Sequence, residues 1–464
     1  MDLTDLVTAI EDRSATGIAG ALHRLINTGE LVDGDRLPTV RELAGTLGTS
    51  PATVAEAWRA LSATGAIVAR GRAGTFVAAQ ARWTSRYHRM SFFADGHPHL
   101  DLSTGVPDPA LLPDLGPALT RVAHRAETSN YIDAPVLAGF GDVLREAWPY
   151  GVPALSVVDG ALDAIDRVLR QVVRWGDRVA VEHPAFPPFL DMLEGLGAVV
   201  VPVDVDMDGP RPGALSAALE QQPVAFVFQP RAQNPTGASL TPARVKALAR
   251  VLRSAPDLMI IEDNHSWLIA ESEELSLGSV FPERTVHVRS FSKSHGPDLR
   301  VAALGGPAQV IEAVQAARQL GPGWTSRLLQ GVLLDMLTDA AVVAAVNKAR
   351  DTYAARREAF RLALSAEGVR VPPGDGLAMW IPVTDERSAV MTLAAAGIGV
   401  SPGLPFCARP VSVSHVRVTI GNLPDEQGPM RAVARMIAVA AGQGGGDGAR
   451  AGQAAQAAHT PHAR

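Results

Sequence analysis

The stretch Val288-Arg289-Ser290-Phe291-Ser292-Lys293 decides the fold of the larger part of this chain of 464 residues. A predicted strand runs directly into a lysine flanked by serines, and Arg300 follows seven residues later. The 42 basic residues include only three lysines, and the other two, Lys246 and Lys348, fall in the middle of predicted helices with a solvated pattern. Lys293 is therefore the primary amine best placed for chemistry.

The residues around this lysine suggest a ligand that carries both a phosphate and an aldehyde. A lysine amine attacks a carbonyl to form a Schiff base. The hydroxyls of Ser290 and Ser292 and the guanidinium of Arg300 are groups that hold a phosphate. Pyridoxal 5'-phosphate supplies both the aldehyde and the dianionic phosphate, so the stretch indicates this cofactor.

Two further segments end predicted strands in the same way, at the place where open α/β sheets bind their ligands. The strand of residues 260–265 ends in carboxylates, and Asp263 there can pair with a pyridinium nitrogen, which makes the ring an electron sink. In the segment 229–237, Asn234 precedes a proline, is held in an extended geometry and can donate to the phenolic oxygen of the cofactor. Asn234, Asp263 and Lys293 follow one another at spacings of 29 and 30 residues, and this ordered set predicts cofactor binding.

Residues 100–435 resemble the fold type I aminotransferases of class I/II. The resemblance implies an α/β fold with a mostly parallel central sheet and a smaller C-terminal α/β subdomain. It also implies that Lys293 and Asp263 are catalytic, with Lys293 as the internal-aldimine lysine, and that Asn234 donates to the phenolate. The same resemblance assigns the phosphate to Ser290, Ser292 and Arg300 and to the helix start at Gly160, Ala161 and Leu162, whose amides lie at a positive helix end.

The resemblance assigns four further residues. Phe186 matches the aromatic residue that stacks on the cofactor ring, and Tyr131 matches a tyrosine that reaches the phosphate of the partner subunit. Arg417 matches the arginine that binds the α-carboxylate of the substrate as a bidentate fork. His265 replaces a tyrosine that commonly lies two residues after the aspartate, so the phenolate is expected to have a weaker or pH-dependent partner. The histidines show no spacing typical of metal ligands, so we expect no metal.

The first 79 residues form a separate unit by their pattern. Apolar residues at 18, 22, 25 and 26 keep helical spacing, and Pro38 with Thr39 starts a second predicted helix. Ser50 and Pro51 start a third predicted helix, and residues 67–70 and 75–77 predict two short strands around a glycine turn. Three helices followed by a hairpin are typical of a winged helix-turn-helix, which places one helix in the major groove of DNA.

The motifs Leu-Pro-Thr-Val-Arg-Glu-Leu-Ala (37–44) and Gly-Arg-Ala-Gly-Thr-Phe-Val (71–77) resemble the DNA-binding domain of the GntR family. Between residues 36 and 72, five arginines face two glutamates, so this half of the domain is basic. The resemblance implies operator contacts from Arg41 in the second helix, from the third helix and from the hairpin. The implied contacts beyond Arg41 are Ser50, Thr53, Arg72 and Gly74.

The rest of the chain is divided by its composition. Residues 80–98 fit neither periodicity and predict a linker, and residues 99–440 alternate short β-branched runs with amphipathic helices, which is typical of an α/β domain. Residues 441–464 lack periodicity and predict a disordered tail. The predicted strands are 178–181, 199–203, 224–228, 258–262, 285–288 and 301–304.

Composition excludes several classes of protein. There is no apolar run long enough to cross a membrane and no signal segment at the start, so we expect no membrane association. Cys407 is the only cysteine, which excludes an internal disulfide and a thiolate metal site and fits a cytoplasmic location. The net charge of −6 argues against a protein that is basic all over.

A winged helix in front of an aminotransferase-like domain resembles the MocR subfamily of GntR regulators. This implies a homodimer that binds operator DNA and responds to an amine, to an amino acid or to pyridoxal phosphate itself, through an external aldimine that displaces Lys293. The alternative is an active aminotransferase that carries a DNA-binding domain. Two further alternatives rank lower: an enzyme whose winged helix binds proteins, and a repressor without a cofactor.

Overall fold

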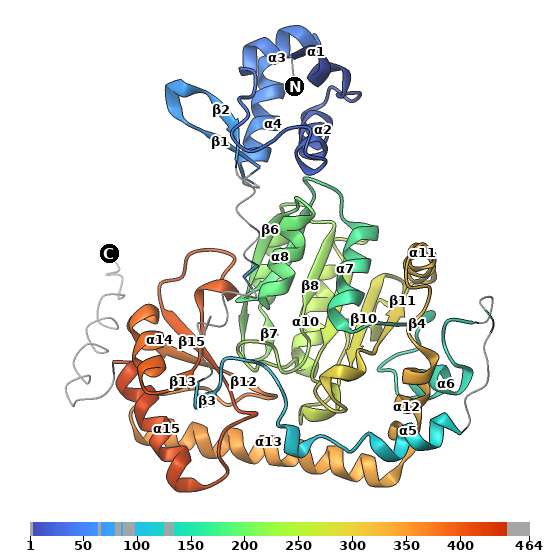
Figure 1. Cartoon of the computed structure of the whole chain (residues 1–464), viewed down its shortest axis with the longest axis vertical. Helices are drawn as coiled ribbons and strands as arrows, with labels where there is room; N and C mark the ends of the chain where they lie inside the picture. Colours follow the sequence, from blue (N-terminus) through green and yellow to red (C-terminus); the bar gives the residue numbers. More distant parts are fainter. Residues whose placement is uncertain are drawn as a thin grey trace, which may run out of the picture.

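The computed structural model describes residues 3–63, 66–78, 85–86, 98–124, 130 and 134–442, without the side chains of Asn27, Ala63 and Arg72. Figure 1 shows a small N-terminal domain that sits above a much larger α/β domain. The predicted linker falls largely outside the described residues, as do Tyr131 and nearly all of the predicted tail.

The N-terminal domain contains the predicted helices and hairpin. The side chain of Thr39 accepts from the backbone N–H of Glu42, and the carboxylate of Glu42 accepts from the backbone N–H of Thr39, so a capping box starts the second predicted helix. Gly48, with a φ of +67°, ends the same helix. A short N-terminal helix, for which the sequence analysis had no signal, precedes them. The elements are α1 (Leu3–Thr8), α2 (Ala15–Asn27), α3 (Val40–Leu47), α4 (Pro51–Ala63), β1 (Ile67–Ala69), η1 (Gly71–Ala73) and β2 (Thr75–Val77).

The large domain is built around an eight-stranded sheet with the order β4-β11-β10-β9-β8-β5-β6-β7. The neighbours β10-β9, β9-β8, β8-β5 and β5-β6 are parallel, whereas β11 runs antiparallel to both of its neighbours and β7 runs antiparallel to β6. All six predicted strands are present and differ from the prediction only at their ends. The strands are β4 (Ala154–Val158), β5 (Arg178–His183), β6 (Val199–Asp206), β7 (Gly209–Pro210), β8 (Ala225–Phe228), β9 (Met259–Asn264), β10 (Thr285–Ser290) and β11 (Ala302–Gly306).

Helices cover both faces of this sheet, as the apolar runs of the strands require. The residues of α7, α8 and α11 form one buried cluster with the strands, and those of α9 and α10 form another on the opposite face. A third cluster joins α5, α6 and α12 to the β4 edge. The helices are α5 (Gly116–Ala123), α6 (Ala138–Glu146), α7 (Ala161–Val172), α8 (Pro187–Gly195), α9 (Pro212–Leu219), α10 (Pro242–Leu252), α11 (Ala308–Gln319) and α12 (Arg327–Thr338).

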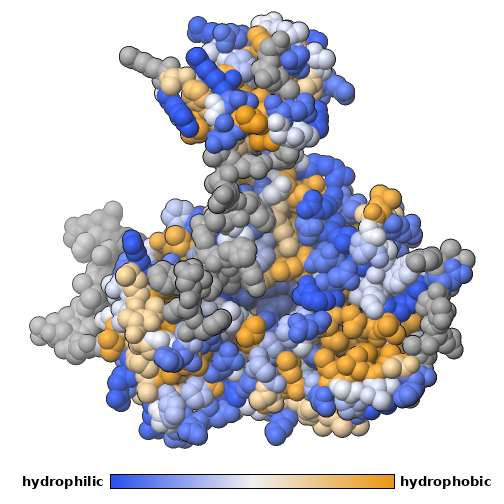
Figure 2. Space-filling model, viewed as in Figure 1, coloured by the Kyte–Doolittle hydropathy of each residue, from blue (hydrophilic) through white to orange (hydrophobic). Residues whose placement is uncertain are grey.

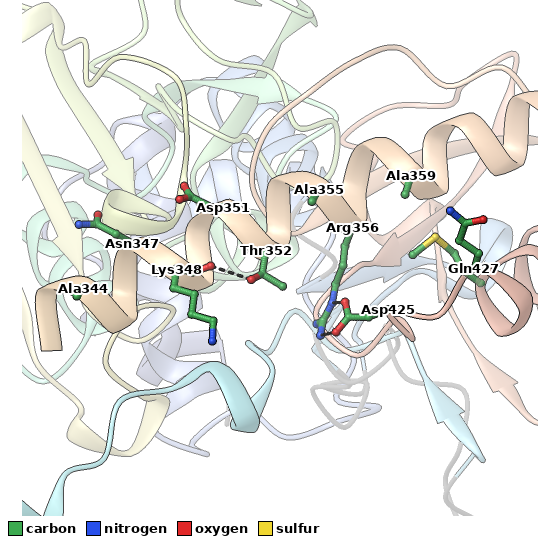
Figure 3. Close-up of a pocket in the computed structure, with 11 residues that line it drawn as sticks. Ala344, Asn347, Lys348, Asp351, Thr352, Ala355, Arg356, Ala359, Asp425 and Gln427 are labelled. Carbon is green, nitrogen blue, oxygen red and sulfur yellow. Dashed lines mark hydrogen bonds and ion pairs between the residues drawn. The ribbon is translucent and has the colours of Figure 1, made fainter. Parts of the chain in front are cut away.

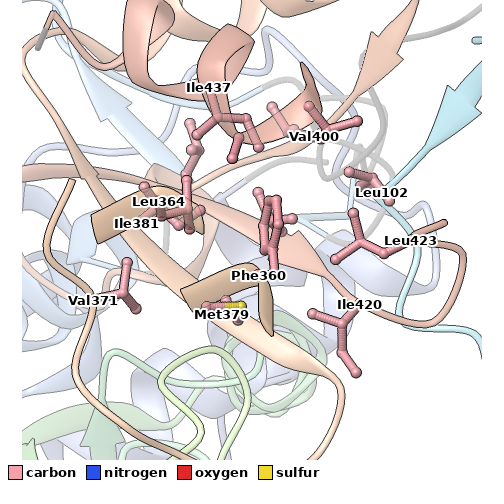
Figure 4. Close-up of a cluster of buried hydrophobic side chains, with 14 of the residues drawn as sticks. Leu102, Phe360, Leu364, Val371, Met379, Ile381, Val400, Ile420, Leu423 and Ile437 are labelled. Atoms are coloured by element: carbon pink, nitrogen blue, oxygen red, sulfur yellow. The ribbon is translucent and has the colours of Figure 1, made fainter. Parts of the chain in front are cut away.

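A smaller subdomain follows the long helix α13 (Ala340–Ala366), which runs beneath both parts of the large domain in Figure 1. The antiparallel sheet of the smaller subdomain has the order β12-β15-β14, and α14 (Glu386–Ala395) and α15 (Gln427–Ala440) pack against this sheet. Figure 4 shows its apolar core, in which Phe360 and Leu364 of α13 meet Met379 and Ile437. The strands are β12 (Ala378–Val383), β13 (Ile398–Gly399), β14 (Ser401–Pro402) and β15 (Ser414–Thr419).

An early strand, β3 (Leu100–Asp101), also belongs to this subdomain because it pairs in parallel with β13. This pairing carries the following residues, Ser103 to Val106, to the carboxyl edge of the large sheet.

In the part of the chain that the structure describes, no single helix combines the length and apolar character needed to cross a membrane. The helices α12 and α13 reach that threshold only when taken together, and they meet at a bend of 78°.

Candidate functional site

A cavity of about 380 Å³ lies where β8, β9 and β10 end. Such a volume suits a small cofactor. Its walls come from the large domain, from the segment after β3 and from β15 of the smaller subdomain. Of the residues predicted at the site, the cavity brings together Ala161, Leu162, Phe186, Asn234, Asp263, His265, Ser290, Ser292, Lys293, Arg300 and Arg417.

Lys293 follows β10 and points at the segment after β3. Its Nζ donates to the carbonyl oxygen of Gly105. Burial, and next the positive charge of Arg417, lower the pKa of Lys293 to about 8, so a larger share of the amine is uncharged near neutral pH. A Cβ at position 105 would lie 3.7 Å from this Nζ and 3.3 Å from Nη1 of Arg417, so a glycine lets the backbone approach both groups.

Asp263 lies at the end of β9 and is 2% exposed. Its Oδ2 accepts from Nε2 of Gln229 at 2.8 Å, and its Oδ1 is buried without a hydrogen-bond partner. Burial raises the pKa of Asp263 to about 6, and the hydrogen bond from Gln229 opposes the rise. A cationic N–H donor at Oδ1 would lower this pKa again.

His265 lines the same cavity, and its Nδ1 is also buried without a hydrogen-bond partner. Burial, and next the charge of Lys293, lower the pKa of His265 to about 3. The neutral form of the imidazole is therefore favoured near neutral pH, and its expected role beside the phenolic oxygen stays a prediction.

Asn234 contributes a third such atom, because its Oδ1 is buried without a partner. The backbone N–H of Asn234 donates to Oε1 of Gln229 at 2.8 Å, which fixes the start of the turn. Buried polar atoms without partners are rare in folded proteins. In this protein Asn234, Asp263 and His265 bring three of them to one cavity, and this concentration points to a ligand with several polar ring atoms.

The other end of the cavity is suited to an anion. α7 starts beside Arg300, whose Nη2 donates to the carbonyl oxygen of Asp159 at 2.9 Å. Gly160, with a φ of +107°, precedes the helix, and a Cβ there would lie only 2.5 Å from the same Nη2. Free backbone amides at a helix start, a guanidinium and the hydroxyls of Ser290 and Ser292 form the usual environment of a bound phosphate.

Arg417 supplies a second guanidinium from β15. It is 1% exposed, and its Nη2 donates to Oγ of Ser401 at 2.7 Å and to the carbonyl oxygen of Ser103. Sequence reasoning missed the residues from Ser103 to Val106 and Gln229, because their partners lie on strands far away in the chain.

A larger groove, of about 810 Å³, runs along α13 (Figure 3) and differs in chemistry. Its cation Arg356 is engaged by Asp425 and Asp108, and Lys348 is exposed. None of the described residues that line it carries a buried polar atom without a partner. It is therefore not the candidate site.

Two protein families match the chain in separate segments. The family of aminotransferases of class I and II matches residues 98–434, and the family of bacterial regulatory proteins called gntR matches residues 14–77. The chain belongs to the MocR subfamily of GntR-type transcriptional regulators. The fold class and the family expected from the sequence are thereby confirmed.

Relatives of this regulator match it over most of its length. The vitamin B6 salvage pathway transcriptional repressor PtsJ of Salmonella typhimurium is 34% identical over 90% of this chain and 96% of its own length. The HTH-type transcriptional regulator TauR of Rhodobacter capsulatus is 30% identical over 84% of this chain and 91% of its own length. Among solved structures, an archaeal alanine:glyoxylate aminotransferase has a TM-score of 0.68 at 22% identity, covering 74% of this chain and 91% of its own.

The cofactor of the regulator is pyridoxal phosphate. The residues present fit it, because unpartnered atoms of Asn234, Asp263 and His265 suit the polar atoms of its ring. The helix start at Gly160 and the guanidinium of Arg300 suit its phosphate. The Lys293 amine lies in the same cavity.

The DNA-binding residues predicted in the N-terminal domain lie on its helices and wing. Arg41 is exposed on α3, and Gly74 lies in the wing with a φ of +110°. The Oγ of Ser50 accepts from the backbone N–H of Thr53 at 3.1 Å and thereby caps α4, and it lies 2.8 Å from Oγ1 of Thr53. The side chain of Arg72 lies outside the described residues.

Two further arginines, Arg36 before α3 and Arg70 after β1, lie at the wing formed by β1, η1 and β2, and sequence reasoning did not single them out. Arg36 is exposed, and its guanidinium packs beside Gly74, where a Cβ would lie 3.1 Å from its Nε. Arg70 is exposed and lies over the ring of Phe76 at 5.1 Å. Both add positive charge to the part of the domain that is predicted to approach the DNA backbone.

Proposed function

We propose that the regulator senses an amine or an amino acid at Lys293 and converts its binding into a change in operator affinity. The observation that carries the proposal is the cavity in which a lysine amine of lowered pKa lies beside the guanidinium of Arg417, in a chain that begins with a DNA-binding domain. Arg417 is suited to a carboxylate, so an amino acid is the favoured class of effector.

Each site residue has a role in this proposal. When bound, pyridoxal phosphate supplies an aldehyde that the Lys293 amine can take up, and a ring that can accept electrons. Asp263 would hold the proton of the ring nitrogen, and Asn234 and His265 would lie on the side of the phenolic oxygen. Phe186 would pack against the ring, and Lys293 would be the amine that an effector amine displaces.

The helix α7 offers a physical route from the site to the DNA-binding domain. Its first turn lines the cavity, and Trp175, three residues beyond its end, packs against the core of the N-terminal domain. The rings of Trp175 and His23 of α2 lie 6.3 Å apart between their centres. Arg86, in the predicted linker, forms an ion pair with Asp191 of α8 at 3.0 Å. A shift of α7 would therefore act directly on the placement of the DNA-binding domain.

The proposal includes a homodimer in the cytoplasm, where bacterial operator DNA is found. Figure 2 shows an apolar patch in the region of α5, α6 and α12. Exposed apolar side chains there include Leu119 of α5, which is 48% exposed, and Leu328 of α12, which is 57% exposed. Contiguous apolar surface of this kind commonly marks an interface between subunits.

The test is an absorbance titration of the cofactor-loaded protein with each common amino acid, followed by operator binding with and without the amino acids that respond. Sensing would be supported if an amino acid causes a spectral shift that persists without catalytic turnover and also changes operator affinity. A spectral shift without any change in operator affinity would contradict it.

A second candidate function is transamination, and the position of Arg417 and Lys293 in one cavity favours it. Bleaching of the absorbance that a keto acid restores over many cycles would identify an aminotransferase. The name of PtsJ also favours pyridoxal phosphate itself as the effector. In that case, adding pyridoxal phosphate to cofactor-free protein would change operator affinity without any amino acid.

A further inference from the structure

Glu182 is a fully buried carboxylate that the proposed function does not use. It lies near the end of β5 with 0% exposure, and no ion pair among the described residues involves it. Two N–H groups form hydrogen bonds to the carboxylate instead. The backbone N–H of Gln229 donates to Oε2 at 3.1 Å, and Nε2 of Gln233 donates to Oε1 at 3.0 Å. A buried carboxyl group without a cation is costly, so its presence requires a reason.

The first donor, Gln229, also forms hydrogen bonds to two residues of the cofactor site. Gln229 donates its backbone N–H to Glu182 and its Nε2 to Asp263 at 2.8 Å, and its Oε1 accepts from the backbone N–H of Asn234 at 2.8 Å. The side chain of Asp263 and the backbone of Asn234 are therefore both linked through Gln229 to the buried carboxyl group of Glu182.

The second donor leads to another wall of the site. Nε2 of Gln233 also donates to the carbonyl oxygen of Pro184 at 2.8 Å, in the turn that runs from β5 to Phe186. Its Oε1 accepts from the backbone N–H of Thr236 at 3.0 Å and thereby holds the turn after Asn234. Through these hydrogen bonds, Glu182 is linked to the ends of β5, β8 and β9, which are followed by or carry Phe186, Asn234 and Asp263.

We propose that Glu182 is a positioning residue for the cofactor ring, which acts through Gln229 and Gln233 on Asp263, Asn234 and Phe186. The inference rests on the cofactor site of the proposed function but not on which effector is sensed. Burial raises the pKa of Glu182 to about 8, while its two hydrogen bonds oppose the rise. A proton held near Asp263 by the ring nitrogen would favour the ionised form of Glu182.

The test compares Glu182→Gln with Glu262→Gln in full-length protein loaded with pyridoxal phosphate alone. Glu262 is the control because it is 0% exposed in the same sheet, and its partners Ser276, Leu277 and His287 do not line the cavity. The glutamine at position 182 keeps the volume of the side chain but can accept only one of the two N–H donors.

We expect Glu182→Gln to bind pyridoxal phosphate about tenfold more weakly, as for one lost hydrogen bond to a charged acceptor. We also expect a changed visible circular dichroism per mole of bound cofactor, because the ring is reoriented. Glu262→Gln should be less stable to heat but keep the wild-type dichroism per mole. If the two variants lose stability alike and both keep wild-type affinity and dichroism, Glu182 has only a structural role and the inference is wrong.

A second variant keeps the inference testable if Glu182→Gln fails to fold. Gln229→Leu removes the bonds to Asp263 and Asn234 but leaves the backbone N–H on Glu182, so it should reproduce the change in dichroism. Wild-type dichroism in this variant would overturn the inference. These measurements contain no effector and no DNA, so a failure of the sensing proposal would leave them unchanged.

Discussion

The two domains present their functional groups in opposite ways. In the N-terminal domain, the arginines proposed to meet DNA are exposed on short elements, as Arg41 and Arg70 illustrate. In the large domain, the proposed functional groups are buried and lie at the ends of strands, as Asp263 and Arg417 illustrate. An exposed site depends on charge that any salt can screen, whereas a buried site depends on the position of each hydrogen bond.

The largest effect is expected for Lys293→Ala, which should abolish cofactor attachment in the large domain and leave DNA binding by the N-terminal domain nearly unchanged. This variant lacks the one lysine among the described residues that line the cavity, so the visible absorbance of lysine-bound pyridoxal phosphate should be lost completely, because an alanine cannot form the covalent bond. Operator affinity without effector should stay within about twofold of wild type. Absorbance spectra and an operator-binding titration on the same preparation measure both. Lysine-bound absorbance in this variant would show that another lysine, Lys246 or Lys348, is the attachment point.

The converse change is Arg41→Ala in the exposed site. The loss of one DNA contact should weaken operator binding by about 1–3 kcal/mol, or roughly five- to 150-fold, and leave the cofactor spectrum unchanged. Arg253→Ala, which removes an exposed arginine of the large domain, is the matched control and should bind operator as wild type does. A loss of cofactor from Arg41→Ala would contradict the independence of the two sites.

The contrast between the domains also explains what could be predicted from the sequence. Local signals define the N-terminal domain: Thr39 and Glu42 form a capping box three residues apart, and Gly48 ends the helix in a left-handed conformation. The strands of the large domain were equally visible, because buried strands are short apolar runs that end in polar residues. Lys293, Asp263 and Asn234 were found for this reason.

The remaining features depend on contacts between distant residues. Gly105 reaches Lys293 because β3 pairs with β13, which lies almost at the other end of the chain. Glu182 and Gln229 are ordinary residues in their own segments, and only the order of β5, β8 and β9 in the sheet makes them neighbours. No local pattern predicts such pairs.

The pH dependence of pyridoxal phosphate uptake tests the lowered pKa of Lys293 in the buried site. Burial and Arg417 lower the pKa of Lys293 to about 8, so the reactive uncharged fraction of the amine rises with pH, reaches one half at about pH 8 and is nearly complete about one pH unit higher. The rate of pyridoxal phosphate uptake by cofactor-free protein should rise about tenfold per pH unit below this value and then level off. Stopped-flow absorbance measures it. Arg417→Met should move the midpoint upwards, and an unchanged midpoint would show that burial alone sets the pKa.

The smallest expected effect is the most informative about the link between the domains. Trp175→Ala removes the contact between the end of α7 and the N-terminal domain but touches neither the cofactor cavity nor the wing. Cofactor absorbance and operator affinity without effector should therefore stay near wild type. The ratio of operator affinities of the cofactor-loaded protein with and without an amino acid that shifts its absorbance should fall several-fold, within the range typical of coupling between two sites.

A double-mutant cycle with His23→Ala decides whether the contact itself carries this coupling. If the rings of Trp175 and His23 act as a pair, the double variant should lose no more of the ratio than Trp175→Ala alone, because the second change removes a partner already lost. Additive losses of the affinity ratio would show that Trp175 and His23 act through separate contacts. A ratio unchanged in all three variants would exclude α7 as the route, and the link would then have to run through the Arg86 ion pair with Asp191 or through a partner subunit.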